Sequence, residues 1–185
     1  MLQQAAEFAA VLSCGLFTGA ALYITLVEHP ARMECGVEIA ATVFAPSYRR
    51  ATALQVPLAS LALLSSTTAW LSGATSWWVV GGALLGAVIP FTLVIILPTN
   101  RKLLCPTLDR RSAQAGELLS RWAFLHAVRT IIGLLSLMLF LYLLVFRPTS
   151  RSAPASTSPA RISRNTNGSL SSLSGLPKPS TSRKK

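Results

Sequence analysis

Three residues near the start of the last long apolar segment place a base, a cation and an aromatic ring on one helix face. Trp122, His126 and Arg129 follow an i, i+4, i+7 spacing, which puts their side chains on the same side of an α-helix. A neutral imidazole can take a proton from a substrate, and a guanidinium can stabilise an oxygen that becomes negatively charged. An arginine inside a membrane span usually faces the bundle interior and marks a functional site. The alternatives for Arg129 are that it reaches the lipid headgroups or pairs with Glu28.

Further polar residues lie at the ends of the other apolar segments, on the same side as the histidine. His29 follows the first segment, Tyr48 precedes the second, Gln55 lies inside the second, and Asn100 follows the third. An ordinary charged membrane interface explains the flanking arginines and lysine. It explains the deeper glutamine, histidine and arginine less well, because polar groups at that depth are costly.

The elements that must position these residues are four apolar segments, 8–27, 51–72, 77–97 and 122–146. Each is long enough to cross a bilayer, which requires about 20 residues. Only 12% of the 185 residues are charged, whereas soluble domains carry about 25%. The first segment could instead be a signal peptide that is cleaved off. This interpretation is weaker than a membrane span, because no basic residue precedes the segment. We therefore predict an all-α fold, a four-helix transmembrane bundle over residues 1–147.

From residue 148 to 185 the sequence becomes rich in Ser, Thr, Pro and basic residues, and it contains no acidic or aromatic residue. Such a segment buries too little apolar surface to offset the entropy of ordering it, so we predict a disordered C-terminal tail. Basic residues in the two connectors on the histidine side favour a cytoplasmic location of that side, whereas the basic tail favours the opposite orientation. The sequence thus predicts a multi-pass protein of an endomembrane with two orientations open.

Several motifs for other kinds of chemistry are missing. The three cysteines form no C-x-x-C pair and no Cys/His ligand spacing, and there is no Gly-rich phosphate loop. We therefore expect no metal site and no cofactor. The net charge of +11 comes without the soluble basic face and interleaved aromatics of nucleic-acid modules, so the expected partner is the lipid bilayer. Gly15-x3-Gly19 and Gly82-x3-Gly86 are small-xxx-small patterns that predict close helix packing, within the bundle or in a homo-oligomer.

Taken together, four short motifs resemble those of the anthrone oxygenase family, and the resemblance covers roughly residues 8–146. They are Glu28-His29-Pro30-Ala31-Arg32, Tyr48-Arg49-Arg50-Ala51 with Gln55, Pro98-Thr99-Asn100-Arg101-Lys102-Leu103, and Trp122-x3-His126-x2-Arg129. The resemblance implies a small four-helix membrane enzyme of polyketide secondary metabolism. Such an enzyme is a monooxygenase that converts an anthrone to the quinone with O2 and uses neither metal nor flavin.

On this hypothesis each candidate residue has a role. His126 is the base, Arg129 stabilises the developing oxyanion, and Asn100 and Gln55 hydrogen-bond substrate oxygens. The remaining candidates bind the hydrophobic aromatic substrate: Trp122 by stacking, Tyr48, and His29, which is also the alternate base. Two other classes remain open, a non-catalytic membrane protein acting through its glycine faces and a small transporter. The transporter would need a polar track along several spans, and the outer halves of these spans are apolar.

Overall fold

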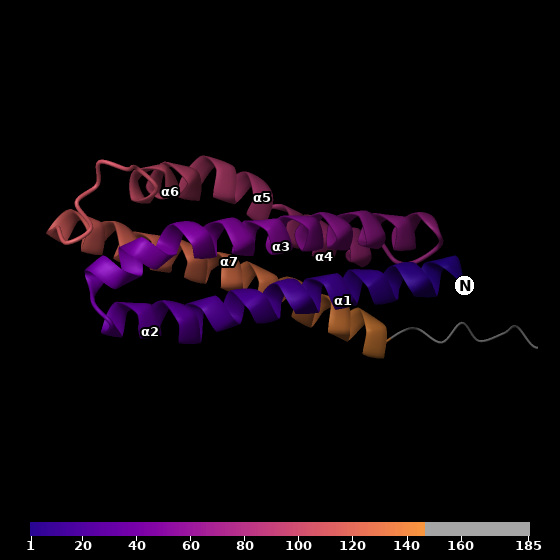
Figure 1. Cartoon of the computed structure of the whole chain (residues 1–185). Coiled ribbons are helices and arrows are strands. Elements are labelled where there is room, and N and C mark those ends of the chain that lie inside the picture. The colour runs from indigo at the N-terminus through magenta and orange to yellow at the C-terminus, as the bar shows by residue number, and fades with distance from the viewer. Residues whose placement is uncertain (147–185) are drawn as a thin grey trace, which may run out of the picture. The chain divides into compact units, whose positions relative to one another are not determined.

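The structure, a computed structural model, describes residues 1–146 as four long helical segments that run up and down in one bundle (Figure 1). The predicted disordered tail, 148–185, lies outside the described residues. The first segment comprises α1 (Leu2–Tyr23), the π-helical turn η1 (Ile24–Glu28) and α2 (His29–Glu34), and the second is α3 (Val37–Leu71). The third comprises α4 (Trp77–Gly86), α5 (Val88–Phe91), the π-helical turn η2 (Thr92–Ile96) and α6 (Leu97–Leu103), and the fourth is α7 (Ala113–Val145). All four are long and apolar enough to cross a membrane, so the chain is an all-α, multi-pass membrane protein.

The helices extend well past the apolar runs of the sequence. α3 begins at Val37 instead of near Ala51, and α7 begins at Ala113 instead of near Trp122. At about 1.5 Å per residue, α3 is about 50 Å long, whereas the hydrocarbon core of a bilayer is about 30 Å thick. The extra turns form because they carry their own buried stripe, which in α3 includes Ala40, Ala41 and Phe44. The helices therefore extend beyond the hydrocarbon layer.

Two π-helical turns occupy equivalent places in the first and third segments. In η1 the N–H of His29 donates to the carbonyl of Ile24, and in η2 the N–H of Leu97 donates to the carbonyl of Thr92, five residues back in each case. Each turn ends two residues before a proline, Pro30 or Pro98. Proline has no N–H and excludes the ordinary i→i−4 bond, and the shift to i→i−5 pairing takes place next to that lost bond.

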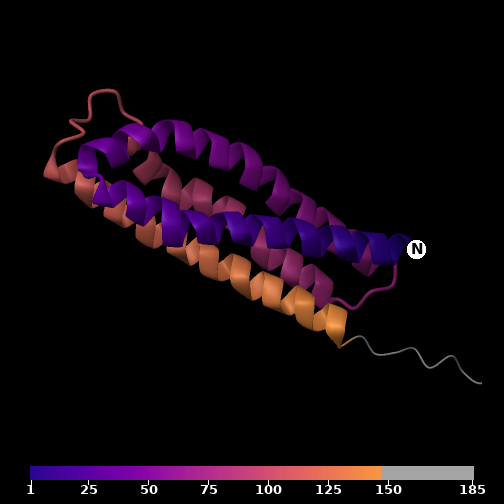
Figure 2. The ribbon, with the colours of Figure 1, turned by 60° about the horizontal axis from the view of Figure 1, so that its bottom comes forward.

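The other prolines interrupt one helical segment and bend another. The third segment is interrupted at Ala87, three residues before Pro90, where α4 ends and α5 begins. α3 stays helical through Pro46 and Pro57, but it bends along its length (Figure 2). A bend without a break is the usual result of losing single backbone hydrogen bonds in a long helix.

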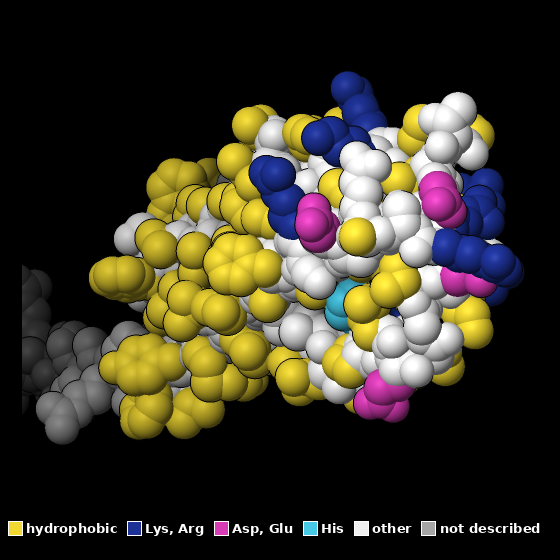
Figure 3. Space-filling model, turned by 90° about the vertical axis from the view of Figure 1, so that its left-hand side faces the viewer, with side chains coloured by type: hydrophobic (Ala, Val, Ile, Leu, Met, Phe, Trp, Pro, Cys, Tyr) yellow, Lys and Arg dark blue, Asp and Glu magenta, His cyan; other side chains and the backbone are white. Residues whose placement is uncertain are grey.

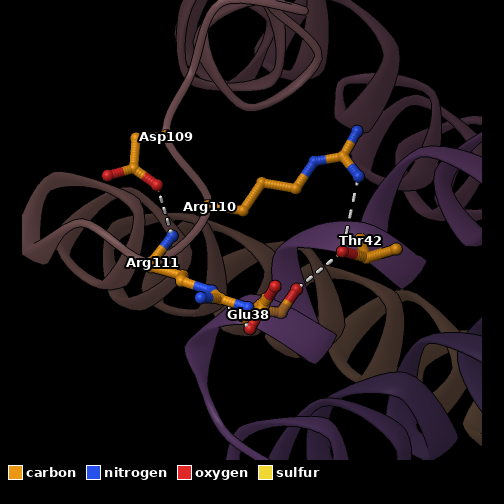
Figure 4. A network of polar contacts seen from close by, with 5 residues as sticks. All are labelled: Glu38, Thr42, Asp109, Arg110 and Arg111. Carbon is orange, nitrogen blue, oxygen red and sulfur yellow. Dashed lines mark hydrogen bonds and ion pairs between the residues drawn. The ribbon is translucent and has the colours of Figure 1, made fainter.

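Charged side chains gather at the end of the bundle that carries the α2–α3 turn and the α6–α7 connector (Figure 3). A polar network ties that connector to the start of α3 (Figure 4). Arg111 Nε lies 2.8 Å from Glu38 Oε2, and Arg110 donates to the Thr42 hydroxyl at 3.4 Å. Ser112 then caps α7 by accepting a hydrogen bond from the N–H of Ala115 at 3.2 Å. The connector thereby fixes where α7 starts.

Two buried apolar clusters stack along the bundle with a polar layer between them. One cluster, towards the chain termini, includes Phe17, Leu85 and Phe140; the other, towards the charged end, includes Phe44 and Trp122. Buried polar side chains lie between the two: Thr18, Gln55, His126 and Thr130. Two of the candidate residues, Gln55 and His126, therefore belong to an internal polar layer. Such polar groups are costly inside a membrane and usually mark a functional site.

Close packing of α3 against α4 depends on Gly82. A Cβ at this position would collide with the side chain of Ser66 and lie 3.3 Å from the Leu63 Cα, whereas a Cβ at Gly19 would meet nothing within 4 Å. We expect Gly82→Val to lower the free energy of unfolding by about 1–3 kcal/mol through overpacking. The measurement is the thermal midpoint of the detergent-solubilised protein, with Gly19→Val as the matched control. Equal midpoints for the two variants would contradict the close α3–α4 contact.

The cysteines allow the orientation to be measured. Cys14 is buried, whereas Cys35 and Cys105 are exposed at the charged end. The Thr107 hydroxyl, 3.1 Å from the Cys105 Sγ, lowers the pKa of Cys105 by hydrogen bonding to the thiolate. We expect a membrane-impermeant maleimide to label both exposed cysteines once the plasma membrane alone is permeabilised, because the basic residues of the short connectors favour a cytoplasmic location of the charged end.

The pH dependence identifies which thiol reacts. Because a lowered pKa leaves more thiolate at neutral pH, Cys105 is expected to react more slowly in a Thr107→Ala variant, and this difference should vanish in alkaline buffer. The Cys105→Ser variant shows which part of the maleimide labelling comes from Cys105. Labelling only after the internal membranes are also dissolved would place the connectors in the lumen and reverse the orientation.

Candidate active site

His126 is held by a threonine cluster at the π-helical turn of the first segment. Its side chain is buried, and its Nδ1 lies 3.0 Å from the Thr25 hydroxyl oxygen. When that hydroxyl donates to the carbonyl of Ala21 at 2.9 Å, its oxygen accepts from Nδ1–H. Thr130 completes the cluster, with its hydroxyl 2.8 Å from that of Thr25. In this arrangement the hydrogen is on Nδ1 and the lone pair is on Nε2, the form of imidazole that we assign to the base.

Trp122 is the centre of an aromatic cluster that surrounds the imidazole. The rings of Trp122 and His126 lie 4.8 Å apart, and the rings of His29 and Trp122 lie 5.4 Å apart. Phe44 meets Trp122 edge-on, with centroids 5.3 Å apart. These contacts keep Trp122 and both histidines in fixed orientations. The stacking of Trp122 on a substrate stays a prediction. The ring of Trp122 already packs against these three neighbours.

Arg129 is a partly buried cation whose described partner is neutral. One guanidinium nitrogen donates to the Gln55 side-chain oxygen at 2.7 Å, and the guanidinium carbon lies 5.7 Å from the Phe17 ring centre. Glu28, the alternative partner, instead accepts from Ser47 at 2.6 Å and lies 3.8 Å from Arg32. Within residues 1–146 no carboxylate pairs with Arg129. Its Nε and the Gln55 amide nitrogen are both buried and unpaired, which leaves donors for an anionic or carbonyl oxygen.

Arg32 is a second cation at this place, and the sequence interpretation did not include it among the site residues. Its side chain is largely buried, and its guanidinium carbon lies 6.0 Å from the centre of the Trp122 ring. Its Nε is unpaired, as is Nδ1 of the neighbouring His29. The site therefore combines two guanidinium groups with two imidazoles and, among the groups described above, one carboxylate, Glu28. This charge balance suits a substrate that becomes an anion.

Asn100 is fully buried on α6, and neither its amide nitrogen nor its amide oxygen has a partner among the described residues. It shares a helix face with Ile96 and Leu103, which pack into the cluster around Trp122. No hydrogen bond joins it to His126 or Arg129, so the structure brings Asn100 to the same end of the bundle without linking it to the base. An orphaned buried amide costs about 1–3 kcal/mol, and a bound ligand or water would relieve that cost.

Three neighbouring cavities meet at Gln55. The central cavity, about 20 Å³, is lined by Arg32, Tyr48, Gln55, Trp122, His126 and Arg129. A larger cavity of about 500 Å³ lies between α3 and the first segment, and a smaller one of about 80 Å³ lies between α3 and the α5–η2 region. Of the seven predicted site residues, five line the central cavity, while His29 packs on its Trp122 wall and Asn100 lies apart. Within residues 1–146, no three His, Cys, Asp or Glu side chains are grouped as metal ligands.

The residues that sequence reasoning missed are Thr25, Thr130 and Arg32. Thr130 carried a readable signal, since it follows His126 by four residues and so shares its helix face. Arg32 lies two residues after Pro30, as Asn100 lies two residues after Pro98. Thr25 carried no such signal, because only the packing of the first segment on α7 brings it to His126.

A family model for anthrone oxygenase matches residues 44–139, just over half of the chain. The chain belongs to the anthrone oxygenase family. No curated protein and no solved structure matches it. The matched region contains Tyr48, Gln55, Asn100 and the three candidate residues of α7, so the family assignment covers most of the site. The part of the site that comes from the first segment lies before the match. Family membership indicates an oxygenase-type function for this multi-pass membrane protein.

Proposed function

We propose that this anthrone oxygenase family member is a cofactor-independent monooxygenase that converts a lipophilic polyketide anthrone to its quinone with O2. The observation that carries the proposal is the pairing of two groups on one cavity wall. His126 offers a lone pair at Nε2, and Arg129 offers a partly buried positive charge with no carboxylate partner among residues 1–146. A base beside an unneutralised cation suits the removal of a proton from a carbon that is conjugated with a carbonyl group.

The reaction begins with removal of a proton. His126 Nε2 takes one proton from the anthrone methylene. The electron pair of the broken C–H bond delocalises through the rings onto the carbonyl oxygen. The guanidinium of Arg129 stabilises that oxyanion, and the unpaired Gln55 amide nitrogen donates to a second substrate oxygen. Burial strengthens these interactions, because the low dielectric around the polar layer weakens screening.

The second stage consumes O2. The anthrone anion gives one electron to O2, and the resulting carbon radical and superoxide combine into a C–O bond. The peroxide oxygen takes the proton back from His126. The O–O bond then breaks as the second methylene hydrogen leaves, and the products are a new C=O group and one water. One O2 is consumed per anthrone: one oxygen atom enters the quinone and the other enters water.

Isotope labelling tests the proposal. Membranes carrying the chain, and matched membranes without it, are supplied with an anthrone under ¹⁸O2, because anthrones also oxidise slowly in air. We expect quinone formation above the background rate, one labelled oxygen per quinone, one O2 consumed per quinone, and no effect of a chelator. A rate equal to that of the control membranes, or release of hydrogen peroxide with unlabelled quinone, would refute the proposed function.

A further inference from the structure

We propose that the two larger cavities are separate subsites for the two substrates of the proposed reaction. The cavity between α3 and the first segment takes the flat aromatic substrate, and the cavity between α3 and the α5–η2 region takes dioxygen. This assignment rests on the proposed function. It adds where each substrate lies and by which side it reaches His126 and Arg129.

The two cavities use different faces of one helix. Ser47, Ala51 and Leu54 of α3 line the larger cavity, whereas Thr52 and Ala59 line the smaller one. Because an α-helix completes one turn every 3.6 residues, these two sets of side chains point in different directions from the same stretch of α3. The central cavity shares Ser47 and Ala51 with the first and Thr52 with the second. The reacting groups thus lie between the two cavities.

Gln55 and Arg129 mark the meeting point. Gln55 lines all three cavities, and Arg129 lines the central and the smaller one. The two side chains are joined by a hydrogen bond of 2.7 Å. A substrate oxygen from the larger side and a reduced oxygen species from the smaller side would both reach this pair.

Size assigns the aromatic substrate to the larger cavity. Its volume of about 500 Å³ lies within the roughly 300–1,000 Å³ of small-molecule sites. Its wall is mainly apolar, and Tyr23 and Leu54 are more than half exposed at its edge. In a membrane-spanning bundle that edge faces lipid, so a lipophilic substrate enters sideways from the bilayer. Glu28 and Arg50 supply the polar end of the cavity.

Size and polarity assign dioxygen to the smaller cavity. A volume of about 80 Å³ is only two to three times the roughly 30 Å³ that a water molecule occupies in the liquid, so three fused rings do not fit. Phe17, Val88, Ile89 and Leu93 make most of its wall apolar, which suits an uncharged gas. Arg129 closes one end, where its charge would stabilise superoxide as it forms.

Filling each cavity tests the assignment through two Michaelis constants. Ala20→Phe places a ring in the larger cavity and is expected to raise the KM for anthrone about tenfold while the KM for O2 stays unchanged. Ala59→Val and Ala59→Leu fill the smaller cavity stepwise and are expected to raise the KM for O2 by up to about tenfold while the KM for anthrone stays unchanged. Gly19→Phe, next to Ala20 but with open space around it, is the control that changes neither constant.

A second measurement does not depend on turnover. Dioxygen is paramagnetic, so pressurising the solubilised protein with O2 should broaden the methyl NMR signals of Val88 and Ala59. The signal of the equally buried Leu119, which lines none of the three cavities, should broaden less. This readout also serves if an Ala59 variant fails to fold.

The outcomes separate the two proposals. A wild-type chain without turnover above background refutes the proposed function. A wild-type chain that turns over, combined with an Ala59→Leu variant whose KM for O2 is unchanged or rises together with the KM for anthrone, refutes the two subsites alone. Equal broadening of Val88 and Leu119 also refutes the dioxygen subsite.

Discussion

Replacing His126 with alanine is expected to lower the rate of quinone formation by about 10²–10⁴-fold, the usual contribution of a general base. The Thr25 hydroxyl accepts from Nδ1, so Nε2 is the nitrogen that takes the substrate proton. The measurement is kcat from O2 uptake by membranes with matched protein levels. Because the variant leaves a small space beside Trp122, added imidazole should restore part of the rate.

Two further variants sharpen this prediction. His29→Ala removes the other imidazole on Trp122 and is expected to cost far less, since His29 has no contact with the threonine cluster. Thr25→Val keeps the shape and removes the acceptor for Nδ1–H, so we expect a smaller loss, of about tenfold, with unchanged KM for anthrone. If His29→Ala abolished turnover and His126→Ala kept it, the base would be His29.

Replacing Arg129 with methionine is expected to lower kcat by about 10²–10³-fold, the range seen when one oxyanion-stabilising donor is removed. The same change should leave the thermal midpoint equal or higher, because it removes a partly buried charge that no carboxylate among residues 1–146 neutralises. Lost activity with retained or increased stability is what distinguishes a residue kept for catalysis from one kept for packing. The two readouts are kcat and the midpoint in detergent.

Arg121→Met is the matched control for this prediction, since Arg121 lies on the same helix and is exposed. It should change neither readout. Arg129→Lys retains the charge but loses the planar fork that binds Gln55, so we expect an intermediate rate. A fully active Arg129→Met would mean that the oxyanion is stabilised elsewhere, with Arg32 the next candidate.

Much of this fold can be read from the sequence because hydropathy and helix length are local properties. The four spans, their common polar end and the joint face of Trp122, His126 and Arg129 need only a period of 3.6 residues. The early start of α3 was missed because its first turns are amphipathic and carry charges, so they resemble a connector. Whether Glu28 or Gln55 would partner Arg129 depended on the packing of three helices, which no spacing rule provides.

Other features required knowledge of the assembled bundle. Trp70, Trp77 and Trp78 lie at span ends, where tryptophans usually form an interfacial belt. Trp77 is exposed, but the Trp78 ring is buried and stacks on Phe140 with the ring centres 5.2 Å apart. Gly19 reads as a packing glycine, yet it meets no neighbour within 4 Å, unlike Gly82. Pro30 and Pro98 indicate where regular helix is disturbed. The π-helical turns before them depend on which carbonyl accepts a hydrogen bond from each N–H, and the sequence does not show this.

The π-helical turn η1 has a consequence for how this chain can change by single insertions and deletions. A π-helical turn holds one residue more than the α-helical turn it replaces. Deleting one residue between Ile24 and Glu28 would restore a regular helix without disturbing either end of the membrane span. It would also shift the residues of the turn itself around the helix, Thr25 among them, by up to about 100°, while α1 and α2 keep their orientation. A lineage that lost one codon here would therefore keep a four-helix membrane protein and displace Thr25 from His126 in a single step.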